Sequence, residues 1–167
     1  MKNIRAPLAA VACATLFALM SGSPADSRLA SDAGRAAEAE LLALHQADRR
    51  AHFARDVDAL LATLPEKLIY VRDGKITNAS KENARKNFTE YFRGAEFSAW
   101  DDLEPPVVRA SPDGKMGWMI VRVKVAYTKM DESGKKSPEE SVMAWMSTYE
   151  KRAGKWMVVA NVTTTAP

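Results

Sequence analysis

Two histidines and one aspartate could carry acid–base chemistry on a helix early in the folded region. The segment 35–55 contains no Gly or Pro and repeats apolar residues at helical spacing, which predicts an amphipathic helix. At about 100° per residue, His45 and His52 point about 20° apart toward the apolar face, and Asp48 lies between them. An imidazole that an aspartate orients can titrate near neutral pH and act as a general base. His45, Asp48 and His52 are therefore the candidate catalytic residues.

The same three residues could instead be hydrogen-bonded members of the core or of a pocket wall, without chemistry. A metal site is not expected, because His45 and His52 lie about 10 Å apart along the helix axis, too far for one ion. The chain also lacks a glycine-rich phosphate loop, a paired-cysteine site, a His-Glu metal signature and a serine elbow. We therefore expect no metal and no cofactor.

Aromatic side chains suggest a second kind of site, a pocket for an apolar ligand. Tryptophans occur in or beside the predicted strands, and tyrosine hydroxyls could orient a bound molecule. Plain aromatic packing is the alternative for each of them, and Trp156 is assigned to the core. The candidate ligand-binding residues are Arg49, Tyr70, Trp100, Trp118, Trp145 and Tyr149.

The elements that must position these residues are helices first and strands afterwards. Asp56 can cap a short helix over 57–64, and Ser80 can cap a third helix. Asp73 and Gly74 predict a tight turn after a strand. Strands are predicted at 67–72, 107–110, 116–128, 141–152 and 155–164, with a polar connection over 131–138. Helices that cover one face of such a sheet make an α+β domain.

Both faces of the longest predicted strand carry apolar residues. Over 116–128, one face includes Val121 and Val123, and the other includes Trp118 and Ile120. Helices cover only one side of the sheet, so we expect a second copy of the chain to cover the other side in a homodimer.

The order of helix, short helix, strand, helix and long-stranded meander resembles the nuclear transport factor 2-like superfamily, including its SnoaL-like and ketosteroid-isomerase-like members. The resemblance covers 35–165, and its local marks are Asp56, the segment 70–74 and the final hairpin over 149–159. It implies a cone-shaped, cystatin-like fold with three N-terminal helices packed on a curved, mostly antiparallel sheet around an apolar pocket. Many catalytic relatives carry an acid or a histidine on the last strand, where this chain has 160–163 as Ala-Asn-Val-Thr.

The first residues predict export. Lys2 and Arg5 precede an apolar run over 6–20 and small residues up to Ala25, which are the parts of a secretory signal peptide. The run is shorter than the roughly twenty residues that span a bilayer, so no membrane anchor is expected after cleavage. The run contains Cys13, the single cysteine, so a processed chain has no thiol. The predicted organisation is a signal peptide over 1–25, a flexible leader over 26–34 and one domain over 35–167, in a periplasmic or secreted protein.

Charge argues for no nucleic-acid partner. The formal net charge is +3, and removal of Lys2 and Arg5 with the signal lowers it to +1. Three functions remain open at this point. The first is binding of a small, largely apolar molecule between the first helix and the sheet. The second is a cofactor-free isomerase, dehydratase or cyclase with a histidine base oriented by Asp48, and the third is a non-enzymatic dimeric scaffold.

Overall fold

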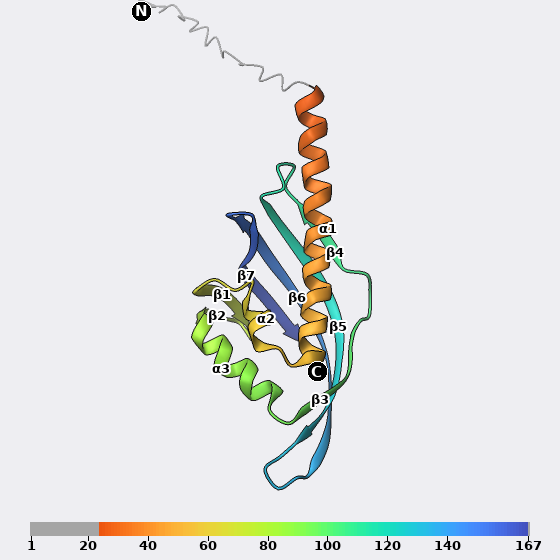
Figure 1. The fold of residues 1–167 in the computed structure, drawn as a ribbon, viewed down its shortest axis with the longest axis vertical. Helices are drawn as coiled ribbons and strands as arrows, with labels where there is room; N and C mark the ends of the chain where they lie inside the picture. The colour runs from red at the N-terminus through yellow and green to blue at the C-terminus, as the bar shows by residue number, and fades with distance from the viewer. Residues whose placement is uncertain (1–23, 167) are drawn as a thin grey trace, which may run out of the picture.

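The computed structural model describes residues 24–166, with side chains from residue 32 onward (Figure 1). The predicted signal peptide lies outside the described residues except for Pro24 and Ala25. The elements in chain order are α1 (Pro24–Ala54), α2 (Val57–Leu61), β1 (Lys67–Arg72), β2 (Lys75–Ser80), α3 (Lys81–Phe92), β3 (Ala95–Asp102), β4 (Val107–Ala110), β5 (Met116–Met130), β6 (Lys136–Arg152) and β7 (Lys155–Thr165).

The long helix α1 begins earlier than the sequence predicts. The stretch expected to be a flexible leader over 26–34 is helical, so that prediction is wrong. Its residues include several strong helix formers and no proline, and Gly34 lies inside the helix rather than before it. A Cβ at Gly34 would lie 3.1 Å from the backbone oxygen of Ser111. The glycine therefore allows α1 to approach the turn between β4 and β5 closely.

The two shorter helices begin at the predicted caps. The Asp56 carboxylate accepts a hydrogen bond from the Ala59 backbone at 3.0 Å, and the Ser80 hydroxyl accepts one from Asn83 at 3.1 Å. Each cap satisfies a backbone N–H group that has no partner within its helix. Both capping predictions are confirmed, although α2 ends at Leu61, before the predicted boundary at residue 64.

The strands form one sheet in the order β2-β1-β7-β6-β5-β3, with β4 also paired to β5. All described strand pairs are antiparallel except β1 with β7, which run parallel. The strand β3 was not predicted, and β6 begins at Lys136 inside the segment expected to be a connection. Register shifts at Ala99 and Tyr149 bend β3 and β6, because a bulge increases the local twist. The sheet curves around α1 as a result (Figure 1).

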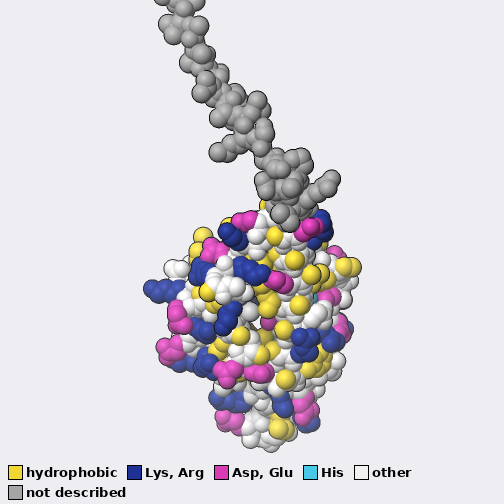
Figure 2. All heavy atoms as spheres, turned by 45° about the horizontal axis from the view of Figure 1, so that its top comes forward, with side chains coloured by type: hydrophobic (Ala, Val, Ile, Leu, Met, Phe, Trp, Pro, Cys, Tyr) yellow, Lys and Arg dark blue, Asp and Glu magenta, His cyan; other side chains and the backbone are white. Residues whose placement is uncertain are grey.

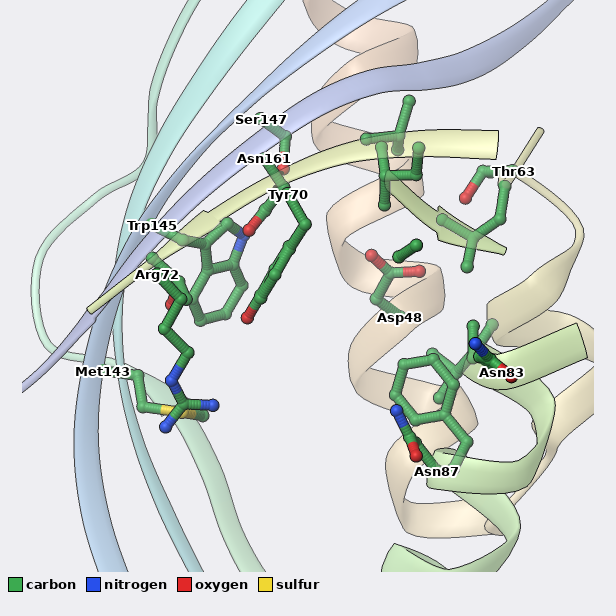
Figure 3. A pocket seen from close by; sticks show the side chains of 18 of the residues that line it. Asp48, Thr63, Tyr70, Arg72, Asn83, Asn87, Met143, Trp145, Ser147 and Asn161 are labelled. Carbon is green, nitrogen blue, oxygen red and sulfur yellow. Dashed lines mark hydrogen bonds between the residues drawn. The ribbon is translucent and has the colours of Figure 1, made fainter. Parts of the chain in front are cut away.

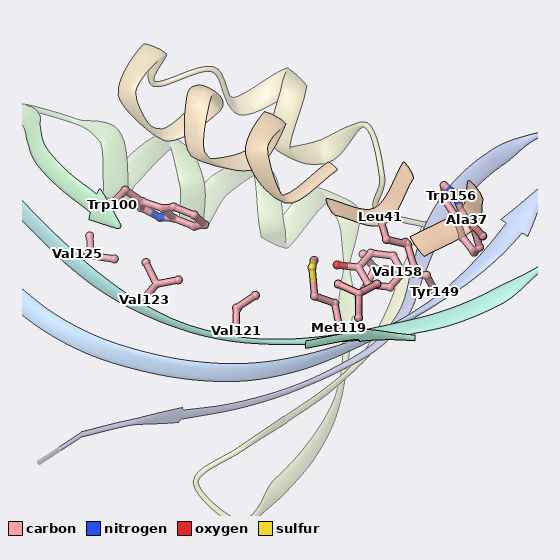
Figure 4. Close-up of a cluster of buried hydrophobic side chains, with 11 residues drawn as sticks. Ala37, Leu41, Trp100, Met119, Val121, Val123, Val125, Tyr149, Trp156 and Val158 are labelled. Atoms are coloured by element: carbon pink, nitrogen blue, oxygen red, sulfur yellow. The ribbon is translucent and has the colours of Figure 1, made fainter. Parts of the chain in front are cut away.

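The main hydrophobic core lies between α1 and the concave face of the sheet (Figure 4). The alternation predicted for β5 is confirmed, since Val121, Val123 and Val125 are buried and Ile120 is 42% exposed on the opposite face. The buried members of this core are Ala37, Leu41, Trp100, Val108, Met119, Val121, Val123, Val125, Tyr149, Trp156 and Val158. A second cluster of Ala51, Leu60 and Phe92 joins the three helices.

The convex face of the sheet carries ion pairs as well as apolar side chains. Arg122 pairs with Glu104 at 2.9 Å, and Lys124 pairs with Glu140 at the same distance. Figure 2 views the molecule from the side on which α1 lies in front of the sheet, and there charged side chains of both signs are interspersed with hydrophobic ones. Within residues 24–166, no helix is long and apolar enough to cross a membrane.

Candidate functional site

A cavity of about 440 Å³ lies between the helices and the concave face of the sheet. Figure 3 shows side chains entering it from α1, the α2 end, α3 and the strands β1, β6 and β7. Its volume falls in the range of small-molecule pockets. It is lined by Asp48, His52, Leu60, Thr63, Leu64, Leu68, Tyr70, Arg72, Ala79, Asn83, Ala84, Asn87, Phe88, Trp100, Met143, Trp145, Ser147, Tyr149, Val158, Asn161 and Thr163.

The sheet contributes to the cavity in rows, because alternate residues of each strand face the same side. One row joins Tyr70 on β1 to Asn161 on β7 and Ser147 on β6. The Asn161 side-chain amide donates a hydrogen bond to the Ser147 hydroxyl at 2.8 Å. The middle of this wall is therefore polar, whereas most of the lining around it is aliphatic or aromatic.

Asp48 faces this wall from α1 (Figure 3). No hydrogen bond or ion pair joins its carboxyl group to another group in the described part of the chain, and burial raises the pKa of Asp48 to about 7. Desolvation has this effect because it disfavours the charged form of a carboxyl group. Asp48 can therefore donate or accept a proton close to neutral pH.

His52 lines the same cavity one turn further along α1. Its Nδ1–H group donates to the backbone carbonyl of Asp48 at 2.7 Å, which leaves Nε2 without a proton in the neutral ring. The ring lies 4.9 Å from that of Trp100, centroid to centroid. Burial lowers the pKa of His52, although the hydrogen bond to Asp48 opposes the shift. The imidazole is therefore neutral around pH 7.

The structure places His45 away from the cavity, which corrects its assignment to the pocket. Its side chain is almost completely buried, and Nε2 lies 2.7 Å from a carboxylate oxygen of Asp102 on β3. Its ring also packs 5.2 Å from that of Trp100. His45 joins α1 to β3, and of the predicted catalytic residues only Asp48 and His52 meet at the cavity.

Two predicted ligand-binding residues also lie elsewhere. Arg49 donates to the Trp100 backbone oxygen and to the Asp101 carboxylate, both at 2.8 Å, outside the cavity lining. Trp118 lies on the convex face of β5, because it alternates with the buried Gly117 and Met119. Tyr70, Trp100, Trp145 and Tyr149 line the cavity, as the sequence predicts.

Tyr149 contributes a hydroxyl group from the deep part of the sheet wall. Its side chain is buried, and this burial raises its pKa to about 12. A phenol with that pKa remains protonated near neutral pH and can donate a hydrogen bond to a ligand.

Several lining residues were not identified from the sequence. Strand alternation around Trp145 and Tyr149 could have indicated Met143 and Ser147, since all four share one face of β6. Asn83 and Asn87 lie four residues apart on α3, at helical spacing, but nothing in the sequence shows that this face meets the sheet. Arg72 also lines the cavity, although the sequence suggests for it only a place in the hairpin that turns at Asp73 and Gly74.

Metal-ligating side chains do not gather within residues 24–166. No group of three or more His, Cys, Asp and Glu residues in this range could hold a metal ion. The polar groups at the cavity are instead a carboxyl, an imidazole, amides, hydroxyls and one guanidinium, which suit an organic ligand.

Comparison with known proteins identifies the fold. No protein-family model and no curated protein matches the chain. A nuclear transport factor 2-like protein of unknown function in nutrient uptake from Rhodospirillum rubrum aligns with a TM-score of 0.58 at 18% identity, over 76% of this chain and 98% of that one. A ketosteroid isomerase-like protein from Erwinia carotovora atroseptica aligns with a TM-score of 0.54 at 20% identity, over 78% and 97%.

A third similar structure is the association domain of CaMKII from C. elegans, with a TM-score of 0.55 at 13% identity, over 80% of this chain and 99% of that one. The protein has the nuclear transport factor 2-like fold, an α+β cone with a large curved sheet, as the sequence predicts. At these identities the similarity describes the architecture, and one architecture supports many functions.

Proposed function

We propose that the protein binds a small, largely apolar molecule in the cavity between α1 and the sheet. The observation that carries this proposal is a 440 Å³ cavity with a mainly aliphatic and aromatic lining and one carboxyl group, Asp48, that has no protein partner within the described residues. Apolar walls with a few convergent polar groups are typical of small-molecule sites. Asp48, Tyr149 and the pair of Ser147 and Asn161 would orient the polar part of the ligand.

Binding can be tested with the neutral fluorescent probe N-phenyl-1-naphthylamine. We expect its fluorescence to rise when it binds the wild type. The rise should be lost in Ala84→Phe, because a phenyl ring added to the lining fills the cavity. The matched control is Ala36→Phe, at an exposed position of α1, which should bind as the wild type does. Equal binding by wild type and both variants would place the probe outside the cavity and contradict the proposal.

Acid–base catalysis is a second candidate, and the unpartnered Asp48 carboxyl with its pKa of about 7 favours it. In this function Asp48, rather than His45, would remove a proton from a carbon next to a carbonyl group and return it at another position. Tyr149 could donate a hydrogen bond to the carbonyl oxygen as negative charge develops there. The reaction would be that of a cofactor-free isomerase.

The catalytic function has its own test. Exchange of the acidic C–H protons of 2-tetralone in deuterated water, followed by NMR, should be faster with the wild type than with Asp48→Asn at pH 7. If the protein binds ligands but the exchange rate does not depend on Asp48, the catalytic function is contradicted and only the binding function stands.

Export and dimerisation remain proposals from the sequence. Lys2, Arg5 and the apolar run over 6–20 support export, and N-terminal sequencing of the full chain expressed in a bacterium would show whether cleavage follows Ala25. Exposed apolar residues on the convex face of the sheet, including Ile120 and Val162, support a homodimer. Light scattering of the wild type and of Ile120→Lys would test it, since the added charge should give a monomer.

A further inference from the structure

Positive charge around the cavity is concentrated at one place. Arg72 is the single Lys or Arg among the described lining residues. It ends β1 and follows Leu68 and Tyr70 on the face of that strand that meets the cavity. Because His52 is neutral near pH 7, the guanidinium is the one positive charge of the described lining.

The guanidinium of Arg72 is free to bind a ligand. Its side chain is 51% exposed, and its described partner is the exposed Asp73 carboxylate, 3.5 Å from Nε. Its two terminal nitrogens make no hydrogen bond to residues 24–166. Arg49, by contrast, has two hydrogen bonds of 2.8 Å to the protein. The N–H groups of a guanidinium without other partners can donate paired hydrogen bonds to the two oxygens of a carboxylate.

The sheet register places Arg72 beside the aromatic wall of the cavity. Tyr70 lies opposite Asn161 on β7, so Arg72, two residues on, reaches the level of Thr163. Thr163 is in turn opposite Trp145 on β6. Figure 3 shows Arg72 near Trp145, with Asp48 further across the cavity. A ligand held by Arg72 would therefore place its body against the Trp145 ring.

We propose that the ligand is a monocarboxylate with an apolar ring system, whose carboxylate binds Arg72 and whose body extends past Trp145 toward Asp48. This inference rests on the proposed binding function and adds the chemical class of the ligand. A single guanidinium balances one negative charge, whereas a phosphate dianion needs more positive charge than the described lining supplies. The opposite orientation would bring a carboxylate to Asp48, where two carboxyl groups could not both ionise.

A matched pair of probes of equal size tests the inference. Isothermal titration calorimetry at pH 7 would compare 2-naphthoate with its neutral amide, 2-naphthamide. In the wild type we expect 2-naphthoate to bind about fivefold more tightly, which is the most that one partly exposed charge pair usually supplies. Arg72→Gln should remove the preference and leave the affinity for 2-naphthamide unchanged. The control Arg109→Gln, at an exposed position of β4 outside the lining, should keep it.

Each other outcome has a distinct meaning. Equal affinity for both probes in the wild type, or a preference that survives Arg72→Gln, would overturn the carboxylate inference while pocket binding stands. If neither probe binds, or if binding is unchanged in Ala84→Phe, the proposed function itself fails. Thermal unfolding of Arg72→Gln would establish that this surface variant is folded.

Discussion

The Nε2–H group of His45 donates to the carboxylate of Asp102 across the interface between α1 and β3, over a distance of 2.7 Å. The imidazole is almost completely buried, and the carboxylate is 23% exposed. A residue that resembles a catalytic base in the sequence therefore holds the long helix on the sheet.

Removing either partner of this pair should lower the free energy of unfolding. We expect His45→Ala and Asp102→Ala each to cost about 1–3 kcal/mol, because the remaining group loses its hydrogen bond in a buried site. The double variant should cost less than the sum of the two, as urea unfolding would measure. In the absence of urea, both single variants should still bind N-phenyl-1-naphthylamine, because His45 and Asp102 do not line the cavity. Additive costs would show that the two side chains do not interact.

The ionisation of Asp48 should make stability depend on pH. The pKa of Asp48 in the folded state is about 7, above the ordinary aspartate value of 3.8, so between these pH values the folded protein holds a proton that the unfolded chain has released. The free energy of unfolding therefore falls by up to about 4 kcal/mol as pH rises from about 4 to 7. Above that range Asp48 causes no further change.

Asp48→Asn should remove this part of the pH dependence and be more stable than the wild type at pH 8. Thermal or urea unfolding at several pH values would measure it. The control is Asp58→Asn on α2, at an exposed position, which should keep the wild-type slope. If the wild type and Asp48→Asn have parallel profiles, the Asp48 carboxyl is not desolvated.

Gly117→Ala should destabilise the protein by about 1–3 kcal/mol through overpacking. The added Cβ would lie 2.6 Å from a methyl carbon of Leu41 and 2.9 Å from the backbone oxygen of Arg109. The comparison variant is Gly134→Ala. Gly134 has a φ of +81° and open space around it, so this substitution measures backbone strain without overpacking. Urea unfolding should show a larger loss for Gly117→Ala. A smaller loss would mean that α1 can move away from β5 at low cost.

Trp145→Ala should weaken binding of N-phenyl-1-naphthylamine about tenfold, because it removes a large aromatic contact from the cavity. Trp118→Ala removes the same side chain from the convex face of β5 and should leave the affinity unchanged. Fluorescence titration of the probe would measure both. A greater loss in Trp118→Ala would locate the apolar site on the convex face.

Periodicity and turn chemistry were sufficient to predict most of the fold. The alternation around Val121 and the turn at Asp73 and Gly74 are local signals, and they place β5 and the first hairpin correctly. The strand β3 has no comparable signal, since its sequence mixes acidic, small and aromatic residues. The start of β6 includes Pro138 and several charged residues, which predict a loop. It becomes a strand because β5 offers a partner there, with Thr128 opposite Pro138.

The candidate site could be predicted only in part, because its composition depends on tertiary contacts. Helical spacing gave His45 and His52 nearly the same direction, but it could not show how far along α1 the cavity extends. Asp102, the partner of His45, lies on the strand that was not predicted. Asp48 was predicted to orient an imidazole through its carboxyl group. Its backbone oxygen does so instead, accepting from His52, and the carboxyl is left to the cavity.

The parallel pairing of β1 with β7 affects how the chain reaches its native state. Tyr70 and Asn161 lie opposite each other although about ninety residues separate them in the sequence, so their contact carries a large loop-closure cost. During synthesis, β7 is the last described strand to emerge from the ribosome. Until it does, the cavity lacks the wall that carries Asn161 and Thr163, and β1 lacks its neighbour in the centre of the sheet. A nascent chain therefore exposes apolar surface until nearly all of the domain has been made, which favours recognition by chaperones that hold unfolded chains.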